Sequence, residues 1–365
     1  MAEVVVAGHL CLDILPAMQH LPPSALASPG KLFEVGPLTF ATGGAVSNVG
    51  LALHRLGADV LLMAALGDDL TAELIRAILR RHGVSDADIR TEAGHSSSYS
   101  VVLAAQGQDR IFLHYTGNNA TFAEPHVNMA AVAQAQIFHL GYPPLLPALT
   151  VDDGAPLAVL YQAVRTQGTV TSLDMAHPDP SGASGRVDWR AVLKRTLPFV
   201  DVFVPSIEEL LFMLRRDDYE RWQGHALTHV TLPYLHDLAE ELLQMGAGIV
   251  GFKLGEAGMY LRASSDRDRL ACARLALDAA SWVGFVGYQP AFAVEVVGTT
   301  GAGDCAYAGL LAGLLRGLPP MDCLRLAAAV GACNVEAADA ISGVRTYEAT
   351  MRRLSSPWPT LPGLE

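Results

Sequence analysis

The chain has 365 residues, 51% of them hydrophobic and 17% charged, which is enough apolar material to bury a sizeable core. Its formal net charge of −12 disfavours a general nucleic-acid binder, because such a protein needs a basic face. The five cysteines form no CxxC pair, so we expect neither a disulfide framework nor a zinc site, and a cytoplasmic chain. The N-terminus lacks a basic segment, so we expect no signal peptide. The longest apolar run is broken by Gln, Pro and Gly, so we expect no membrane span.

Short β-branched runs alternate along the chain with longer amphipathic runs. The run at 3–8 predicts a buried strand, and 46–57 predicts a helix that ends at Gly57. A strand is expected over 59–67, followed by a helix that packs Leu74, Ile75, Ile78 and Leu79 together, turns Arg76 and Arg80 outward and ends at Gly83. Further strands are expected at 136–140, 169–175, 201–205 and 248–255. This alternation predicts an α/β fold, with a mostly parallel sheet covered by helices on both faces.

Two regions interrupt the alternation. Residues 12–42 are rich in proline and glycine and are expected to be extended, and residues 97–115 look like a hairpin that turns at Gly107. Together they predict a small β-structured lid, built from about 12–42 and 97–117. No polar linker is long enough to require two independent domains, so we expect one domain over residues 1–365.

Two polar clusters follow predicted strands in the N-terminal part. Asp13 lies just beyond the first strand, where a carboxylate can accept hydrogen bonds from two sugar hydroxyls. In "ATGGAVSNVG" at 41–50, Gly43 and Gly44 precede a helix whose first turn carries Asn48, an amide that can donate and accept. A turn aspartate and a close helix–strand contact would explain the same residues without any ligand.

The segment "GTTGAGD" at 298–304 leads from an extended run into an almost wholly apolar helix. Glycines allow backbone N–H groups to approach a ligand closely, and the helix N-terminus favours an anion. A carboxylate such as Asp304 would repel that anion, so its position needs an explanation. It has a use there if it removes a proton from a hydroxyl that attacks a phosphoryl group. The alternative is a tight turn in which Asp304 caps the helix. The spacing matches neither a Walker A loop nor GxGxxG.

These clusters together resemble one family. The segments "GGAVSNVGLALHRLGADVLLMAALGDD" and "TTGAGDCAYAGLL" are similar to the two signature motifs of the ribokinase-like, or PfkB, carbohydrate kinases, in the same order and at the expected separation. The resemblance covers essentially the whole chain. It implies a Rossmann-like central sheet with helices on both faces and a small β lid over the sugar site.

The resemblance also implies roles for individual residues. Asp304 would be the catalytic base, with the backbone amides of Gly301, Ala302 and Gly303 forming an anion hole beside it. The expected sugar-binding residues are Asp13, Gly43, Gly44, Asn48 and, in the lid-edge segment "GNNATF", Asn119. The expected nucleotide-binding residues are Lys253 and Gly255 of "KLGEAG", Thr299, Gly301 and Gly303.

Metal binding follows from the same resemblance. "PSIEEL" at 205–210 is similar to the family's N-x-x-E segment, so Glu209 would reach Mg²⁺ through water, with Ser206 in the place of the usual asparagine. Gly298 stands where the family commonly has an aspartate, in a region that binds a monovalent cation in several members. We therefore expect strict magnesium dependence and a weak response to K⁺.

The predicted function is transfer of a phosphoryl group from ATP to a hydroxymethyl group of a small sugar. A neutral monosaccharide ranks first because the clusters contain no lysine or arginine, although Arg110 after the lid turn could meet an acidic sugar. A nucleoside kinase and a catalytically silent sugar- or nucleotide-binding regulator remain alternatives.

The role of Asp174, at the end of a predicted strand, stays open between binding and structure. Exposed lid edges could pair two copies into a homodimer.

Overall fold

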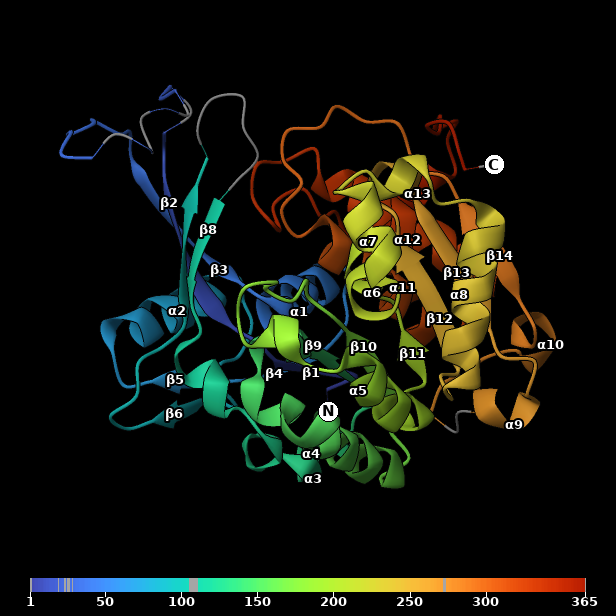
Figure 1. The fold of residues 1–365 in the computed structure, drawn as a ribbon. Coiled ribbons are helices and arrows are strands. Elements are labelled where there is room, and N and C mark those ends of the chain that lie inside the picture. The colour runs from blue at the N-terminus through green and yellow to red at the C-terminus, as the bar shows by residue number, and fades with distance from the viewer. Residues whose placement is uncertain are drawn as a thin grey trace.

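The computed structural model describes residues 2–18, 20–22, 24, 27, 29–104, 111–271 and 274–364. Figure 1 shows a central sheet between two groups of helices, with a second, smaller sheet rising from one side. None of the helices in these ranges is both long and apolar enough to cross a membrane.

The central sheet is mostly parallel, as the alternation of strands and helices predicted. Its order is β14-β13-β12-β11-β10-β9-β1-β4, and only β13 and β14, at one edge, run antiparallel to their neighbours. The strands are β1 (Val4–Gly8), β4 (Val60–Met63), β9 (Ile137–Gly141), β10 (Val170–Asp174), β11 (Val202–Phe203), β12 (Ile249–Lys253), β13 (Met259–Ala263) and β14 (Val286–Gln289).

Helices cover both faces of this sheet, because its strands carry apolar side chains on both sides. In β1, Val4 and Val6 belong to one buried cluster while Val5 and Ala7 belong to the other. The first cluster includes residues of α1 (Ala45–Arg55), α2 (Leu70–Arg81), α9 (Arg267–Leu270), α10 (Ala279–Trp282), α11 (Ala302–Leu315), α12 (Pro320–Asn334) and α13 (Tyr347–Leu354). The second includes α3 (Met129–Val132), α4 (Pro147–Thr166), α5 (Trp189–Thr196), α6 (Ile207–Leu214), α7 (Arg216–Trp222) and α8 (Leu232–Gln244).

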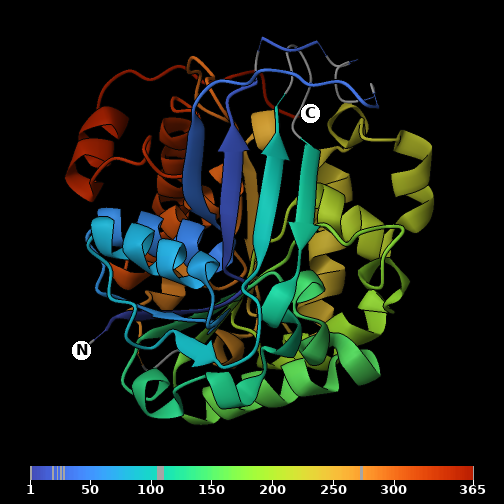
Figure 2. The ribbon, with the colours of Figure 1, turned by 90° about the vertical axis from the view of Figure 1, so that its left-hand side faces the viewer.

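The predicted lid is a four-stranded sheet, which Figure 2 shows face on. Its order is β3-β2-β7-β8, with β2 (Cys11–Pro16), β3 (Leu38–Gly43), β7 (Tyr99–Leu103) and β8 (Ile111–Tyr115). The predicted hairpin is the antiparallel β7–β8 pair. The predicted turn residue Gly107, and Arg110 after it, lie outside the described residues.

Three details of the structure differ from the sequence prediction. Residues 59–67 form two strands instead of one: β4 stays in the central sheet, whereas β5 (Ala65–Gly67) pairs with β6 (Arg90–Glu92). In α2 the buried stripe is Ala72, Ile75 and Leu79, so Leu74 falls on the outer side and is 38% exposed. Arg76 does not point freely into solvent, because its guanidinium donates to the Asp86 carboxylate and the Ile89 carbonyl.

Candidate active site

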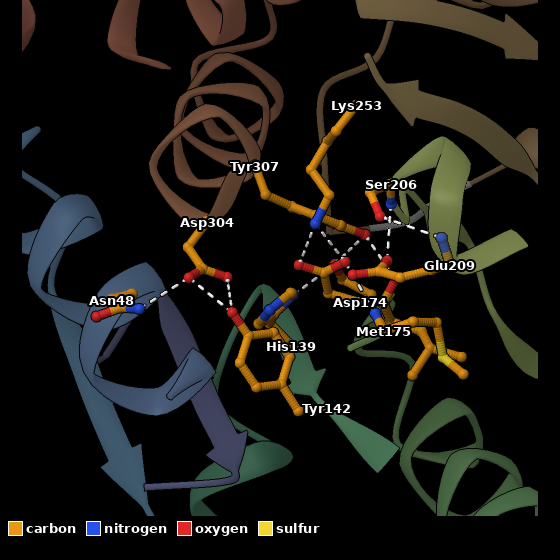
Figure 3. Close-up of polar contacts among 12 residues, drawn as sticks. Asn48, His139, Tyr142, Asp174, Met175, Ser206, Glu209, Lys253, Asp304 and Tyr307 are labelled. Carbon is orange, nitrogen blue, oxygen red and sulfur yellow. Dashed lines mark hydrogen bonds and ion pairs between the residues drawn. The ribbon is translucent and has the colours of Figure 1, made fainter. Parts of the chain in front are cut away.

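The sequence motifs meet where the central strands end. From β1 the chain first adds β4 on one side, and it then adds β9, β10, β11 and β12 in turn on the other side. The strand order therefore switches direction between β1 and β9. In open α/β sheets the crevice beyond the carboxyl ends of the strands at such a point is where ligands bind. Asn48 of α1, Tyr142 after β9 and Asp304 of α11 lie close together there, as Figure 3 shows.

Asp304 occupies the first turn of α11 and is only 4% exposed. Gly301 precedes the helix in a left-handed conformation, with φ of 70°, which a side chain would make costly. The carboxylate accepts a hydrogen bond from Asn48 Nδ2 to Oδ2 at 2.8 Å, and the Tyr142 hydroxyl lies 2.7 Å from both carboxylate oxygens (Figure 3). Asn48 and Tyr142 therefore fix the rotation of the Asp304 carboxylate.

A buried cation lies beside the loop of α11. Lys253 ends β12, and its Nζ donates to both carboxylate oxygens of Asp174 at 2.7 Å (Figure 3). A side chain on Gly303 would begin 3.3 Å from Lys253 Cδ and 3.6 Å from Nζ, so the ammonium group adjoins the backbone of the predicted anion hole. Burial alone would lower the pKa of Lys253, but Asp174, Glu209 and Asp304 together raise it, so the lysine is a cation at neutral pH.

On the opposite side lies Asp13, carried by β2 of the small sheet. A Cβ atom on Gly43 would fall 2.3 Å from Asp13 Oδ2, so the glycine is needed for β3 to pass this carboxylate. Burial raises the pKa of Asp13 to about 6, although hydrogen bonds from Cys11 and Ser100 oppose the shift. The structure thus brings Asp13 and Gly43 together as the resemblance implied.

Gly44 and Asn119 both contact the segment that connects β1 and β2, Gly44 at His9 and Asn119 at Leu10. Gly44 opens α1 with φ of 88°, and a side chain there would meet His9 Nδ1 at 2.3 Å. Asn119 is fully buried, and its Nδ2 donates to the Leu10 carbonyl at 2.9 Å while its Oδ1 faces the Leu10 N–H at 3.4 Å. Because Leu10 engages both ends of this amide, Asn119 holds the β1–β2 connection in place.

The predicted metal residue Glu209 and the predicted nucleotide residues Lys253 and Gly255 lie at or after the ends of β11 and β12, whereas the other predicted nucleotide residues, Thr299, Gly301 and Gly303, lie at the start of α11. Ser206 caps α6, and Glu209 Oε2 accepts the Ser206 N–H at 2.8 Å, which uses one oxygen of the carboxylate. Gly255 turns the chain after β12 with φ of 54°, and Thr299 is exposed at the loop before α11. Within the described ranges no group of three or more His, Cys, Asp or Glu side chains could hold a metal ion by itself.

The structure leaves little room for a side chain at Gly298. A Cβ atom at this position would lie 2.9 Å from the carbonyl oxygens of Ala337 and Ala338. An aspartate could enter here only if that neighbouring segment moved.

Two residues of the site escaped the sequence analysis. Tyr142 follows β9 with φ of 69° and ψ of 48°, a left-handed conformation that is rare for an aromatic residue and that places its hydroxyl on Asp304. His9 lies between Gly8 and Leu10, next to Gly44. A single tyrosine before two prolines carries no sequence signal for such a role, since its partner Asp304 lies 162 positions later.

Comparisons with known proteins point to one family. A family model described as pfkB family carbohydrate kinase matches residues 1–346. Fructokinase-1 of Oryza sativa subsp. japonica is 25% identical over 313 residues, covering 85% of this chain and 82% of the rice protein. The 2-dehydro-3-deoxygluconokinase of Bacillus subtilis is 25% identical over 328 residues, 90% of each chain. Arabidopsis thaliana ribokinase, solved with ribose and ATP, has a similar fold, with a TM-score of 0.74 at 19% identity and coverage of 98% and 99%.

Proposed function

Because the chain belongs to the PfkB family of carbohydrate kinases, we propose that it transfers the γ-phosphoryl group of ATP to a hydroxymethyl group of a neutral monosaccharide. The observation that carries the proposal is the Asp304 carboxylate, held by Asn48 and Tyr142 at the start of α11. A carboxylate at a helix N-terminus that otherwise suits an anion has a clear use as the base for an acceptor hydroxyl.

In this mechanism the acceptor hydroxyl hydrogen-bonds to Asp304, which takes its proton as the oxygen attacks the γ-phosphorus in line. The backbone N–H groups of Gly301, Ala302 and Gly303 lie at the start of α11 and would offset charge that develops on the transferred group; in the structure the Ala302 N–H donates to the Thr299 carbonyl at 3.3 Å. Lys253 adds a positive charge beside Gly303. Magnesium bound with ATP would neutralise further phosphate charge, and Glu209 is the carboxylate suited to reach it through water.

The choice of a neutral sugar rests on charge. Asp13 and Asp304 are carboxylates, and the one buried cation near them, among the residues described, is Lys253, whose ammonium is engaged by Asp174. A sugar acid would bring a third carboxylate into this group, and the part of the chain that the structure describes offers no free cation beside it to offset that charge. A nucleoside would instead require an aromatic platform for its base, and exposed rings are available on the lid at Phe40, Tyr99 and Phe112.

A comparison of acceptors tests the assignment. We expect kcat/KM for fructose or ribose to exceed that for 2-keto-3-deoxygluconate, adenosine and inosine, measured as ADP formation under one set of conditions. A preference of more than tenfold for a nucleoside would favour the nucleoside kinase instead. No ADP formation above the uncatalysed rate with any of these acceptors would support the catalytically silent alternative.

The pH dependence of acceptor binding should report Asp13. Its raised pKa of about 6 means that the carboxylate is ionised above pH 6 and protonated below it. Only the ionised form accepts hydrogen bonds at both oxygens, so kcat/KM for the acceptor should fall as the pH drops through about 6, whereas KM for ATP stays level. Asp13→Asn should weaken acceptor binding and abolish this step. An unchanged step in that variant would assign it to another group.

The small sheet of the lid exposes many apolar side chains. Every residue of β8 is exposed, and apolar side chains gather on the small sheet, namely Leu38, Phe40, Tyr99, Ile111, Phe112, Leu113 and Tyr115. We propose that two copies pair through these lids, since exposed apolar strands at a sheet edge favour association. Sedimentation should show a dimer that Phe112→Glu and Leu113→Lys together convert to a monomer. A dimer unaffected by the double variant would contradict the proposal.

A further inference from the structure

His9 is the one buried histidine in the described part of the chain whose two ring nitrogens both lack a hydrogen-bond partner. The side chain is 2% exposed and directly follows β1, at the point where the chain reverses direction across the sheet. A buried polar group without a partner costs free energy, so such groups in native proteins usually meet a ligand or water. His139 provides a contrast, because its Nδ1 pairs with the Ser172 hydroxyl at 2.9 Å.

The surroundings of His9 link the two halves of the site. Its ring centroid lies 5.9 Å from that of Tyr142, whose hydroxyl holds Asp304, and 5.2 Å from that of His114 on lid strand β8. On another side its Nδ1 adjoins the backbone of Gly44, the residue after Gly43, which itself packs against Asp13. His9 therefore lies between the predicted sugar-binding carboxylate and the predicted base.

A second unpartnered atom belongs to the same group. Asn48 donates through Nδ2 to Asp304, but its Oδ1 is buried and has no partner among the described residues. Asn48 lies one helical turn after Gly44 in α1, and its N–H bonds to the Gly44 carbonyl at 2.9 Å. His9 and Asn48 thus bring three uncommitted polar atoms close to the residues that contact Asp13 and Asp304, where an acceptor molecule must lie if Asp304 is the base.

We propose that His9 binds the acceptor sugar directly, as a neutral donor and acceptor for one of its hydroxyl groups, and so helps to select uncharged polyols. This inference rests on the proposed kinase function. A neutral imidazole offers one N–H and one lone pair, which matches a hydroxyl group that both donates and accepts.

Two features keep the ring neutral. Burial, together with the neighbouring His114, lowers the pKa of His9 to about 3. His9 accordingly carries no positive charge that could attract a sugar acid, and it can serve a neutral alcohol over the whole physiological pH range.

The test compares His9→Leu with His9→Gln. Leucine has a similar size but no polar atom, so we expect kcat/KM for the preferred acceptor to fall about tenfold, mainly through KM, while KM for ATP is unchanged. Glutamine restores a donor and an acceptor, so we expect that variant to stay within about threefold of the wild type. His126→Leu serves as the control, because His126 pairs with Glu92 at 2.7 Å and should leave the acceptor KM unchanged.

Direct binding separates this inference from the proposed function. The thermal shift produced by fructose, ribose or adenosine without ATP should be lost in His9→Leu and retained in His9→Gln, with all variants melting cooperatively. A folded His9→Leu variant with the acceptor KM of the wild type, or a glutamine variant as impaired as the leucine one, would overturn the role of His9 while leaving the kinase function intact. A wild type that neither binds nor phosphorylates any of these molecules would contradict both.

Discussion

Replacing Asp304 with asparagine should lower kcat by about 10²–10⁴-fold, which is the usual contribution of a general base. Asparagine preserves the size of the side chain and an oxygen that can still accept from Asn48 or Tyr142, so the fold and nucleotide affinity should remain. The measurements are ADP formation at saturating acceptor and the dissociation constant for ADP.

Asp188→Asn is the matched control for that experiment. Asp188 also stands at a helix N-terminus, where its side chain accepts the Ala191 N–H. If Asp304 were only a helix cap, both substitutions would have the same small effect on turnover. Activity of the Asp304 variant within a few-fold of wild type, in a preparation free of native enzyme, would remove this residue from the mechanism.

Gly303→Val should reduce kcat/KM for ATP by about 10²-fold or more, which is the cost of losing one donor of an anion hole. Even the first atom of the new side chain would lie 3.3 Å from Lys253 Cδ, and the branched methyl groups would occupy the space between the loop and the lysine. The fold should be affected less, because residue 303 lies in the first turn of a helix that continues for three more turns.

Gly303→Ala gives a graded comparison, since it adds only the Cβ atom. We expect an intermediate loss of activity from alanine and a larger one from valine, with melting temperatures that change much less than the rates. Full activity in the valine variant would mean that phosphate does not approach this loop.

Much of the fold could be predicted from the sequence, because its signals are local. Strand β1 is a run of β-branched residues, and α1 and α2 carry apolar residues at helical spacing before glycine stops. The antiparallel edge strands β13 and β14 were not predicted. They have no local signal that separates them from loops, and their pairing depends on β12 being already in place.

The site was predictable to the extent that glycine-rich motifs mark it. Gly43 and Gly301 matter for close approach and for backbone conformation, and both stand in recognisable motifs. The pairs Lys253–Asp174 and Tyr142–Asp304 join residues far apart in sequence, so no local pattern predicts them. Lys253 meets Asp174 because β12 and β10 belong to the same sheet. Tyr142 meets Asp304 because the segment after β9 lies against the start of α11. Asn119 differs from these glycines: a motif match predicts that it binds sugar, and in the structure its amide is engaged by the backbone of Leu10.

Ser206 illustrates how a departure from a family motif can be accommodated. Its hydroxyl faces the Glu209 N–H at 3.4 Å, while Glu209 accepts from the Ser206 N–H, so the two residues cap α6 reciprocally. Serine preserves this cap, and the orientation of Glu209 with it, although the side chain is shorter than the usual asparagine. Lys253, at the end of β12, pairs with Ser206 in an isolated parallel β-bridge. Its positive charge therefore lies on the same side of the site as Ser206.

In the proposed mechanism Asp304 enables phosphoryl transfer to an alcohol group of a sugar. The most direct measurement is the mass and ³¹P spectrum of the product formed from MgATP and the preferred acceptor, by the wild type and by the Asp304→Asn variant at equal concentration. We predict a sugar monophosphate ester on a hydroxymethyl carbon, formed in a 1:1 ratio with ADP by the wild type and at least about a hundredfold more slowly by the variant. Release of inorganic phosphate without a sugar ester, or equal rates of ester formation by the two proteins, would contradict the claim.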